Sequence, residues 1–307
     1  MAEITVVGGI NIDIEGSPFD KLKYCDSNPG KIHLAFGGVG RNIAENVARL
    51  GGDVAMVSVI GDDYMGVSAK KELEELGVDT SCIRTLAGYN SAMYLSILND
   101  KNDMELALCD MDIIDAIDPD VLEEHKKFIS RSKVLALDGN LTQELICSAV
   151  EMFKDIPVFF DPVSCAKAVK AKNCIGGFHS IKPNVMEAEI LTGVTVKGDE
   201  DIRRAADIMI DRGVKQVFIT LNREGVYYKD IISEGFIRPA ENLNIVSATG
   251  AGDSFSAAVL LAMAEGKSIE ETARMGMAAA SIAMESSHAV NSKMNLQELL
   301  RRLRKDV

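Results

Sequence analysis

The sequence is poor in the residues that build most metal and disulfide sites. It has four histidines, and none of its six cysteines lies in a CxxC pair. This spacing fits neither a zinc site nor a dense disulfide framework, so we expect reduced thiols in a cytoplasmic protein. The scattered histidines argue against a metal site built on imidazoles.

The sequence also lacks long apolar runs, and it has fewer basic than acidic residues. No stretch reaches the length of a membrane-spanning helix, and the first residues lead into a predicted strand at 4–7 rather than a signal peptide. The 33 basic residues are outnumbered by 46 acidic ones, which gives a net charge of −13. That charge argues against nucleic acid or an anionic membrane as a partner. A polyanionic substrate would need local donors and a metal ion to hold it.

What the sequence does have is an alternation of short apolar strands and amphipathic helices. Its 307 residues, 47% hydrophobic and 26% charged, can bury one large core. Runs of Val, Ile and Phe between helices predict a doubly wound α/β fold, a mostly parallel sheet with helices on both faces. We expect strands at 4–7, 54–59, 134–137, 158–160, 180–181, 216–220 and 225–228, and helices at 41–50, 66–76, 119–130, 142–153, 185–192, 201–212, 253–265, 269–286 and 296–305.

Two stretches break this alternation, at about residues 11–36 and 88–110. Within them, residues 94–98 and 105–108 flank a polar turn and predict a hairpin, and residues 31–36 alternate like another strand. Strands inserted near the edge of an α/β domain predict a small sheet that projects from it as a lid. We therefore expect one domain over residues 1–307, with a lid whose outer face pairs with a second subunit in a homodimer.

The most informative motif is Thr249-Gly250-Ala251-Gly252-Asp253, which opens a predicted helix. Small residues let the backbone turn tightly and approach a ligand. A helix that begins there points N–H groups and the positive end of its dipole into the turn. The motif therefore predicts an anion site, above all for phosphate, at Gly250, Ala251 and Gly252. Asp253 is then a carboxylate beside a phosphate, where a kinase needs a base for the substrate hydroxyl.

A second glycine-rich turn, Gly37-Gly38-Val39-Gly40, leads into a predicted helix with Asn42 in its first turn. Its spacing does not match the GxGxxG fingerprint, which argues against a dinucleotide-dependent oxidoreductase. Close backbone approach at Gly38, with the donor and acceptor of Asn42, would suit a small polar ligand. A glycine turn with an asparagine near the helix start explains the same residues without any ligand.

Polar residues at other strand ends are further candidates. Asp13 follows the first strand, at the sheet edge where parallel α/β proteins bind ligands, and could accept hydrogen bonds from a polyhydroxyl compound. Asn184 and Glu187 predict a capping box at a helix start, or oxygen ligands that hold the waters of a magnesium ion, and both can hold at once. Two more strands end in Asp138 and Asp161, each a weak signal by itself.

Taken in order, these motifs resemble the ribokinase-like carbohydrate kinase family, the PfkB family, over nearly the whole chain. The most specific part is Asn184-x-x-Glu187 followed, at this separation, by the motif at 249–253. The resemblance implies a doubly wound α/β domain with a β-sheet lid. It also implies transfer of the ATP γ-phosphoryl group to a primary sugar hydroxyl, with Mg²⁺ as a cofactor.

The resemblance further implies a role for each candidate residue. Asp253 would be the catalytic base, and the N–H groups of Gly250, Ala251 and Gly252 would form the anion hole. Substrate contacts would come from Asn11, Asp13, Gly38, Asn42, Ser164 and Lys167. Nucleotide contacts would come from Lys182, Asn184, Thr220, Asn222, Gly225 and Asn291, and magnesium would be held through water by Asn184 and Glu187.

Four further segments, residues 26–31, 37–44, 110–113 and 157–164, resemble the pseudouridine kinases within the family. They imply phosphorylation of the 5′-hydroxyl of pseudouridine, with ribokinase or another sugar or nucleoside kinase as the alternative. A catalytically silent binding protein is a second alternative, which the retained Asp253 disfavours. Two positions depart from the family. Ser247 stands where an Asp is associated with a monovalent-cation site, so potassium activation stays open, and Asn222 replaces a glycine of the nucleotide turn.

Overall fold

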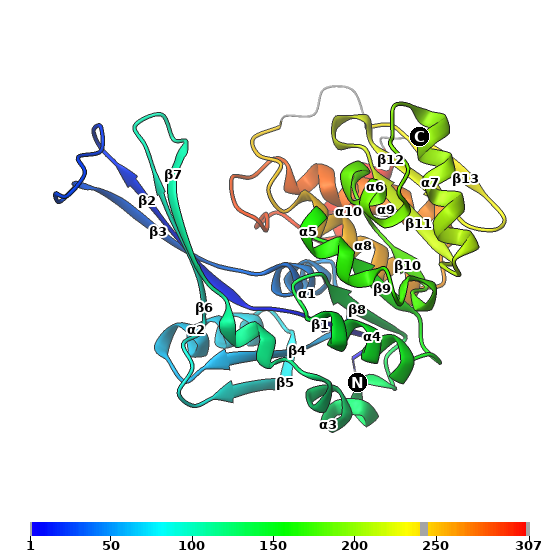
Figure 1. Ribbon diagram of the computed structural model, residues 1–307, viewed down its shortest axis with the longest axis horizontal. Coiled ribbons are helices and arrows are strands. Elements are labelled where there is room, and N and C mark those ends of the chain that lie inside the picture. Colours follow the sequence, from blue (N-terminus) through cyan, green and yellow to red (C-terminus); the bar gives the residue numbers. More distant parts are fainter. Residues whose placement is uncertain (1, 240–244, 305–307) are drawn as a thin grey trace.

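The structure, a computed structural model, describes residues 2–239 and 245–304. Within these residues the larger sheet has nine strands in the order β13-β12-β11-β10-β9-β8-β1-β4-β5 (Figure 1). Their bounds are β1 (Ile4–Val7), β4 (Val54–Gly61), β5 (Asp79–Leu86), β8 (Val134–Asp138), β9 (Val158–Asp161), β10 (Ser180–Ile181), β11 (Gln216–Thr220), β12 (Val226–Lys229) and β13 (Glu234–Ile237). The strands run parallel except that β12 pairs antiparallel with β11 and β13. The predicted doubly wound α/β fold is confirmed.

Helices cover both faces of this sheet, because successive residues of a strand point to opposite sides. Phe160 of β9 belongs to a core cluster that includes residues of α3 (Pro119–Ile129), α4 (Gln143–Met152), α6 (Val185–Thr192) and α7 (Asp199–Asp211). Phe159, one position earlier, belongs to the cluster on the other face, with α1 (Val39–Arg49), α2 (Tyr64–Glu75), α8 (Ala251–Ala264) and α9 (Ile269–Ala283). A third cluster joins α10 (Leu296–Leu303) to α8 and α9. Lys305, the last residue of the predicted C-terminal helix, lies outside the described residues.

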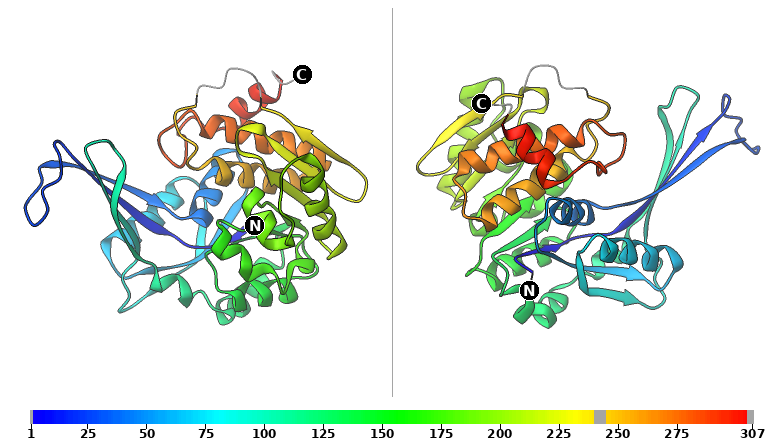
Figure 2. Two further views of the ribbon diagram at one scale, coloured as in Figure 1. Left: turned by 45° about the horizontal axis from the view of Figure 1, so that its top comes forward. Right: turned by 180° about the vertical axis from the view of Figure 1, so that it is seen from behind.

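A smaller sheet projects from the body of the molecule (Figures 1 and 2). Its strand order is β3 (Gly30–Gly37), β2 (Asn11–Pro18), β6 (Ala92–Leu98) and β7 (Met104–Asp110). The central strands β2 and β6 run parallel, and each outer strand pairs antiparallel with its neighbour. Both segments that break the helix–strand alternation thus enter one sheet, and the predicted hairpin is its β6–β7 half. We call this four-stranded sheet the lid.

Two strands of the larger sheet were not predicted. The edge strand β5 contains Asp79, Thr80, Ser81 and Arg84, so it lacks the apolar run of a central strand. The other edge strand, β13, has four residues, one of which is Gly235. Across the described ranges, no helix combines the length and the apolar character needed to cross a membrane.

Candidate active site

The candidate residues gather where the parallel strands of the larger sheet end. Asp138 is the last residue of β8, Asp161 is the last residue of β9, and Lys182 directly follows β10. These three strands are parallel neighbours, so their carboxyl ends meet at one edge of the sheet. The lid leaves the body at the same edge, because β2 follows β1 after the short turn at residues 8–10. This is the edge where ligands bind in open α/β sheets.

The glycine turn before α8 has the backbone that an anion site needs. Gly250 is the N-cap residue in the left-handed region, with φ of 75°. A Cβ at Gly250 would lie 1.7 Å from the carbonyl oxygen of Ala289, so the turn has no room for a side chain there. α8 begins at Ala251, and N–H groups in the first turn of a helix have no partner within it. The Lys182 ammonium lies 3.5 Å from where a Cβ of Gly252 would be, which adds positive charge beside the turn.

Asp253 lies in the first turn of α8 and faces α1. The side-chain amide of Asn42 donates a hydrogen bond to its Oδ2 over 2.8 Å. Burial, followed by the charge of Asp161, raises the pKa of Asp253 to about 7. The Asn42 hydrogen bond and the charge of Lys182 oppose this rise, whereas the charge of Asp138 adds to it. A carboxyl group with a pKa near the working pH is well suited to accept a proton.

A buried ion pair lies beside Asp253. The ammonium of Lys182 is 3.2 Å from Oδ2 of Asp161, and the hydroxyl of Ser256 donates to the same oxygen over 2.7 Å. Both charged side chains are buried, so each supplies the partner without which the other would be strongly destabilising. Sequence reasoning treated Asp161 only as a strand-end acid and missed its pairing with Lys182. β9 ends in Asp161 and Lys182 follows the next strand of the chain, but only the pairing of β9 with β10 brings the two side chains together.

Asp138 is the second acid that sequence reasoning undervalued. Its Oδ1 accepts a hydrogen bond from the backbone N–H of Asn140 over 2.7 Å, and its Oδ2 has no hydrogen-bond partner among the described residues. Burial raises the pKa of Asp138 to about 6. Its Oδ2 would be 2.4 Å from a Cβ on Gly8 and 3.1 Å from one on Gly40, so the glycines let the carboxyl approach the backbone.

The predicted substrate residues near the lid are brought together. The side-chain amide of Asn11 donates to Oδ1 of Asp13 over 2.6 Å. Gly38 has φ of 104°, and a Cβ there would lie 2.4 Å from the carbonyl oxygen of Gly9 and 3.0 Å from Oδ1 of Asn11. Burial raises the pKa of Asp13, against the Asn11 hydrogen bond and the charge of Arg41. Side-chain amide and carboxyl groups thus converge beside a backbone that admits no side chain.

Ser164 and Lys167 lie at the start of a short helix after β9, near Asp138. The ammonium of Lys167 donates to Oδ1 of Asn140, in the loop that follows β8, and its charge lowers the pKa of Asp138. Ser164 is the N-cap residue of the short helix α5 (Cys165–Ala168), and its N–H donates to the carbonyl of Pro162. Lys167 is therefore joined to the site by its bond to Asn140 and its charge near Asp138, whereas Ser164 is linked to it only as the N-cap of the same helix. Asn140 is a further polar group at this place, and sequence reasoning did not select it.

Asn184 and Glu187 form the predicted capping box at the start of α6. The Glu187 carboxylate accepts from the backbone and side-chain amides of Asn184, and Oδ1 of Asn184 accepts from the Glu187 N–H, each over 2.9 Å. Glu187 is buried, and burial raises its pKa against the positive charge of Lys182. Thr220, the last residue of β11, forms an isolated parallel bridge with Asn184. These bonds explain the motif structurally, and each carboxylate oxygen keeps a further lone pair for a bound water.

The turn between β11 and β12 contains two residues with positive φ, a backbone conformation that favours glycine. Asn222 has φ of 54°, a left-handed conformation that asparagine tolerates better than most residues. Asn222 can therefore occupy the position where the family has glycine without a change of backbone. Gly225 has φ of 104°, and a Cβ there would lie 2.0 Å from the carbonyl oxygen of Ile237.

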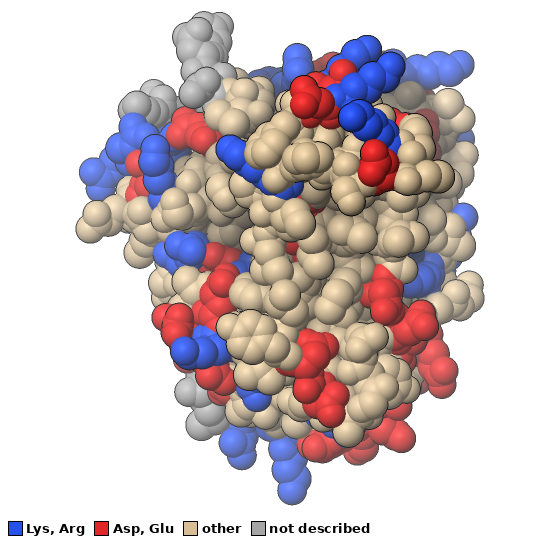
Figure 3. Space-filling view, turned by 90° about the vertical axis from the view of Figure 1, so that its left-hand side faces the viewer, with Lys and Arg blue, Asp and Glu red and all other residues tan. Residues whose placement is uncertain are grey.

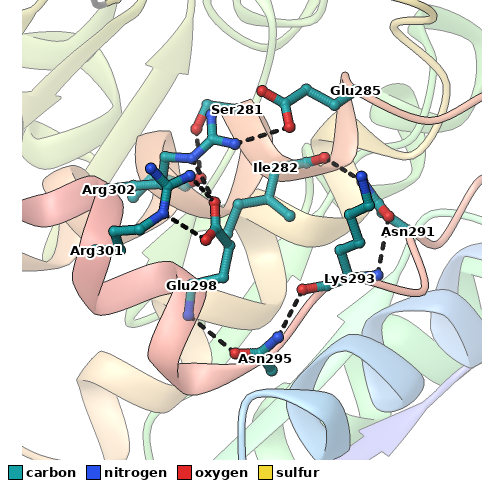
Figure 4. Close-up of polar contacts among 10 residues, drawn as sticks. Ser281, Ile282, Glu285, Asn291, Lys293, Asn295, Glu298, Arg301 and Arg302 are labelled. Carbon is teal, nitrogen blue, oxygen red and sulfur yellow. Dashed lines mark hydrogen bonds and ion pairs between the residues drawn. The ribbon is translucent and has the colours of Figure 1, made fainter.

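Asn291 is buried and already uses both ends of its side-chain amide (Figure 4). Its Nδ2 donates to the carbonyl of Ile282 over 2.6 Å, and its Oδ1 accepts from the N–H of Lys293 over 2.9 Å. These bonds fasten the loop after α9, the loop whose Ala289 carbonyl lies against Gly250. The side chain of Asn291 thus supports the glycine turn through the backbone, and its predicted contact with adenine stays a prediction.

The position of the family's cation-associated acid is occupied by a small hydroxyl. Oγ of Ser247 accepts from the N–H of Thr249 over 3.1 Å, and the Ser247 N–H donates to the carbonyl of Met284. Within the described ranges, no group of three or more His, Cys, Asp or Glu side chains is placed to hold a metal ion.

This fold and this site define a class of protein. The family model for pfkB family carbohydrate kinases matches residues 1–295 of the chain. The chain therefore belongs to this family and is a phosphotransferase with an alcohol group as acceptor.

Individual relatives agree with that assignment. The chain is 34% identical over 298 residues to a pseudouridine kinase from Escherichia coli, an alignment that covers 97% of this chain and 95% of the relative. It is 30% identical over 304 residues to a ribokinase from Haemophilus influenzae, with 97% of both chains covered. Among solved structures, a carbohydrate kinase from Agrobacterium tumefaciens superposes with a TM-score of 0.88 at 29% identity, covering 99% of this chain and 97% of that one.

Proposed function

We propose that the protein transfers the γ-phosphoryl group of ATP to the 5′-hydroxyl of pseudouridine. The bond between the γ-phosphorus and the β,γ-bridging oxygen breaks, a bond between that phosphorus and the 5′-oxygen forms, and Asp253 takes the proton of the hydroxyl. The observation that carries the proposal is the place of Asp253, in the first turn of α8 beside the Gly250–Gly252 backbone, with its pKa raised to about 7. A carboxylate beside the N–H groups of a helix start combines a base with an anion hole.

The turn that opens α8 brings backbone N–H groups and the charge of Lys182 close to Asp253. The N–H groups of the Gly250 turn stabilise charge on the phosphoryl group in transfer. Lys182, beside Gly252, contributes a fixed positive charge whose position is set by Asp161. The net charge of −13 makes such local donors necessary for a polyanionic nucleotide. Catalysis then consists mainly of positioning and electrostatic stabilisation, as in phosphoryl transfer generally.

Magnesium fits this arrangement as a water-bound ion. The Glu187 carboxylate, fixed by Asn184, faces the charges of Lys182 and Asp161 and can hold the waters of the ion through its remaining lone pairs. When bound, Mg²⁺ supplies positive charge to the phosphate oxygens. We place the nucleotide along Thr220, Asn222 and Gly225, where Asn222 is exposed on the turn between β11 and β12.

The residues that we propose to bind the acceptor are suited to a nucleoside. Asn11 and Asp13 offer a bonded amide–carboxyl pair to the ribose hydroxyls, beside Gly38 and Asn42. Lys167, held by Asn140, lies in α5, just after the segment 157–164 that resembles the pseudouridine kinases. The relative from Escherichia coli with 34% identity is a pseudouridine kinase. We place the base at Lys167 and Ser164.

We also propose a homodimer formed through the lid. Residues paired across the lid share a face, and one face is apolar on all four strands. This apolar lid face comprises Ile14, Ile32, Leu34, Leu95, Ile97, Leu106 and Leu108. Ile32, Leu106 and Leu108 are more than half exposed, and such a contiguous patch is typical of an interface. Asp13 lies on the opposite face, so a second subunit could cover the apolar lid face without occupying the site.

In the space-filling view of the side on which the lid projects, uncharged residues form a continuous area in the middle, with acidic and basic groups around it, above and below the centre as well as at the margins (Figure 3). A surface of this kind loses little charge solvation when a second copy of the chain covers it.

A coupled assay of ADP release tests the function. Pseudouridine, uridine, ribose and fructose are each offered with ATP and Mg²⁺, and the product is identified by mass and by ³¹P NMR. The proposal expects the highest kcat/KM with pseudouridine and a 5′-phosphate product. Preference for free ribose would establish a ribokinase instead, and no turnover with any acceptor would overturn the proposal.

A further inference from the structure

Arg41 is a buried arginine next to the catalytic motif residue Asn42. Its Nη1 donates to Oδ1 of Asn42 over 3.2 Å and lies 2.6 Å from Oε2 of Glu45. Its Nη2 lies 2.6 Å from Oε1 of Glu72, on α2. Arg41 thus joins three side chains, of which two are carboxylates and one is an amide. Sequence reasoning assigned no role to this residue.

The contact with Asn42 fixes which way that amide points. An asparagine side chain has an acceptor oxygen and a donor nitrogen, whereas a guanidinium can only donate. Oδ1 of Asn42 must therefore face Arg41, and Nδ2 is left to face Asp253. A flipped amide would place its NH₂ group against the guanidinium and its oxygen against the Asp253 carboxylate. Both contacts would be repulsive.

We propose that Arg41 is a positioning residue that holds the Asn42 amide in the one orientation in which it donates to Asp253. This inference concerns the site described under the proposed function and rests on it for its catalytic consequence. With Oδ2 held by Asn42, Oδ1 of Asp253 is the oxygen left to accept the substrate proton. Glu45 and Glu72 in turn hold the guanidinium, so the orientation of Asn42 is set from α1 and α2 together.

The orientation also affects the charge state of Asp253. The groups that face this carboxyl are Asn42 from α1, Asp138 and Asp161 from the strand ends, and Lys182. Asn42 and Lys182 favour the ionised form, and the two acids disfavour it. Without the Asn42 hydrogen bond, only Lys182 opposes the effect of Asp138 and Asp161 among these groups. The pKa of Asp253 therefore moves further upward. Because the base must be ionised to act, the acid limb of the pH–rate profile moves to higher pH.

The simplest alternative is that Arg41 only neutralises Glu45 and Glu72. Arg49 offers a matched control, since its Nε also lies 2.6 Å from Glu45, but its contacts do not include Asn42. We compare Arg41→Met with Arg49→Met in the full-length protein, using ATP, Mg²⁺ and pseudouridine. For Arg41→Met we expect roughly 10- to 100-fold loss of kcat/KM, typical of a misplaced catalytic group, together with an acid limb at higher pH. For Arg49→Met we expect near wild-type values and an unmoved limb.

Two further variants guard against a failure to fold. Arg41→Met leaves the buried Glu45 carboxylate with Arg49 as its remaining ion-pair partner, so Arg41→Met/Glu45→Gln is made as well. Arg41→Lys keeps the charge without the fork that reaches Asn42 and the carboxylates together. Each folded Arg41 variant should have the acid limb of its pH–rate profile at higher pH than the wild type. The shift for Arg41→Lys should be smaller than that for Arg41→Met. A loss of kcat/KM with an unmoved limb, or equal effects of the Arg41 and Arg49 variants, would overturn the proposal.

A second readout does not need turnover. The carboxyl carbon of Asp253 is titrated by ¹³C NMR in the wild type, Arg41→Met and Arg49→Met. A higher pKa in Arg41→Met alone supports the positioning role even if none of the offered acceptors is phosphorylated, which would count only against the proposed function. Identical titration curves in all three proteins would remove the role of Arg41.

Discussion

The side-chain amide of Asn42 lies 2.8 Å from Oδ2 of Asp253 and so joins two glycine-rich turns that are 211 residues apart in the sequence. The first turn leads to α1 and the substrate candidates, and the second leads to α8 and the anion site. In the proposed site, Asp253 is thus held from the acceptor side while it faces the phosphate side. A substrate hydroxyl that reaches Asp253 there must come close to Asn42.

Asp253→Asn should separate chemistry from binding. Asparagine has nearly the same size and can keep a contact with Asn42, but it cannot take a proton from the hydroxyl at neutral pH. We expect kcat to fall by roughly 10²- to 10⁴-fold, as for the loss of a general base. The Kd for ATP, measured by calorimetry, should stay within about twofold, since Asp253 is not a nucleotide ligand in the proposed site. Turnover near the wild-type rate would remove Asp253 as the base.

The same substitution should stabilise the protein at neutral and alkaline pH. The pKa of Asp253 is raised from 3.8 to about 7 in the folded chain, so the folded state binds more protons than the unfolded state between these values. The stability of the wild type then falls as the pH rises through this window, and above it the ionised carboxylate is destabilising. Asparagine removes that charge. Thermal unfolding should show a larger gain in Tm for Asp253→Asn at pH 8 than at pH 4, and an equal gain at both would contradict the raised pKa.

Elements with a strong local signal can be predicted closely from the sequence. The helix predicted at 185–192 matches α6, because Asn184 and Glu187 form its capping box. The two edge strands β5 and β13 lack such a signal. The polar side chains of β5 suit the border of a sheet, and β13 is defined only by its pairing with β12. Their position in the sheet, rather than their own composition, makes them strands.

The candidate site likewise contains residues that a local motif indicates and residues that only the fold brings together. Gly250 and Asp253 belong to a short motif whose backbone and charge requirements are local, so the sequence alone points to them. Arg41 and Asp161 act through residues that the chain brings together, since Ser256 lies 95 positions after Asp161 and Glu72 lies 31 positions after Arg41. No pattern within a few residues encodes such pairs. They become visible only when the strand ends and helix starts are placed in space.

Gly250→Ala should damage the glycine turn before α8, which is the proposed phosphate site. Gly266→Ala, at the other end of α8, is the matched control. Both glycines have positive φ, 75° and 69°, so alanine costs about 1 kcal/mol of backbone strain at either position. Only at Gly250 would the new Cβ also meet a backbone atom, the Ala289 carbonyl, whereas at Gly266 no described atom lies within 4 Å of it. We expect Gly250→Ala to lower the free energy of unfolding more than Gly266→Ala does, in urea titrations, and to raise the KM for ATP at least tenfold. Equal effects on that KM would argue against the turn as the phosphate site.

Arg302→Ala should loosen the C-terminal helix more than Arg301→Ala. Both arginines bond Glu298, but Arg302 also lies 2.8 Å from Glu285 at the end of α9 (Figure 4). Arg302 is also the more buried of the two, so its ion pairs are less screened by solvent. We expect Arg302→Ala to cost about 1 kcal/mol more in the free energy of unfolding than Arg301→Ala, measured by urea denaturation. Equal costs would mean that the link from α10 to Glu285 contributes nothing.

Charge on the apolar lid face should prevent dimerisation without harming the fold. Leu106 and Leu108 of β7 are exposed and lie on that face, so Leu106→Asp/Leu108→Asp would bury two carboxylates in the proposed interface, which is strongly unfavourable. Met186 on α6 is equally exposed but lies away from the lid, so Met186→Asp serves as the control. Sedimentation equilibrium should give a dimer mass for the wild type and for Met186→Asp, and a monomer mass for the lid variant. A monomeric wild type, or a lid variant that remains dimeric, would show that the apolar lid face is not the interface.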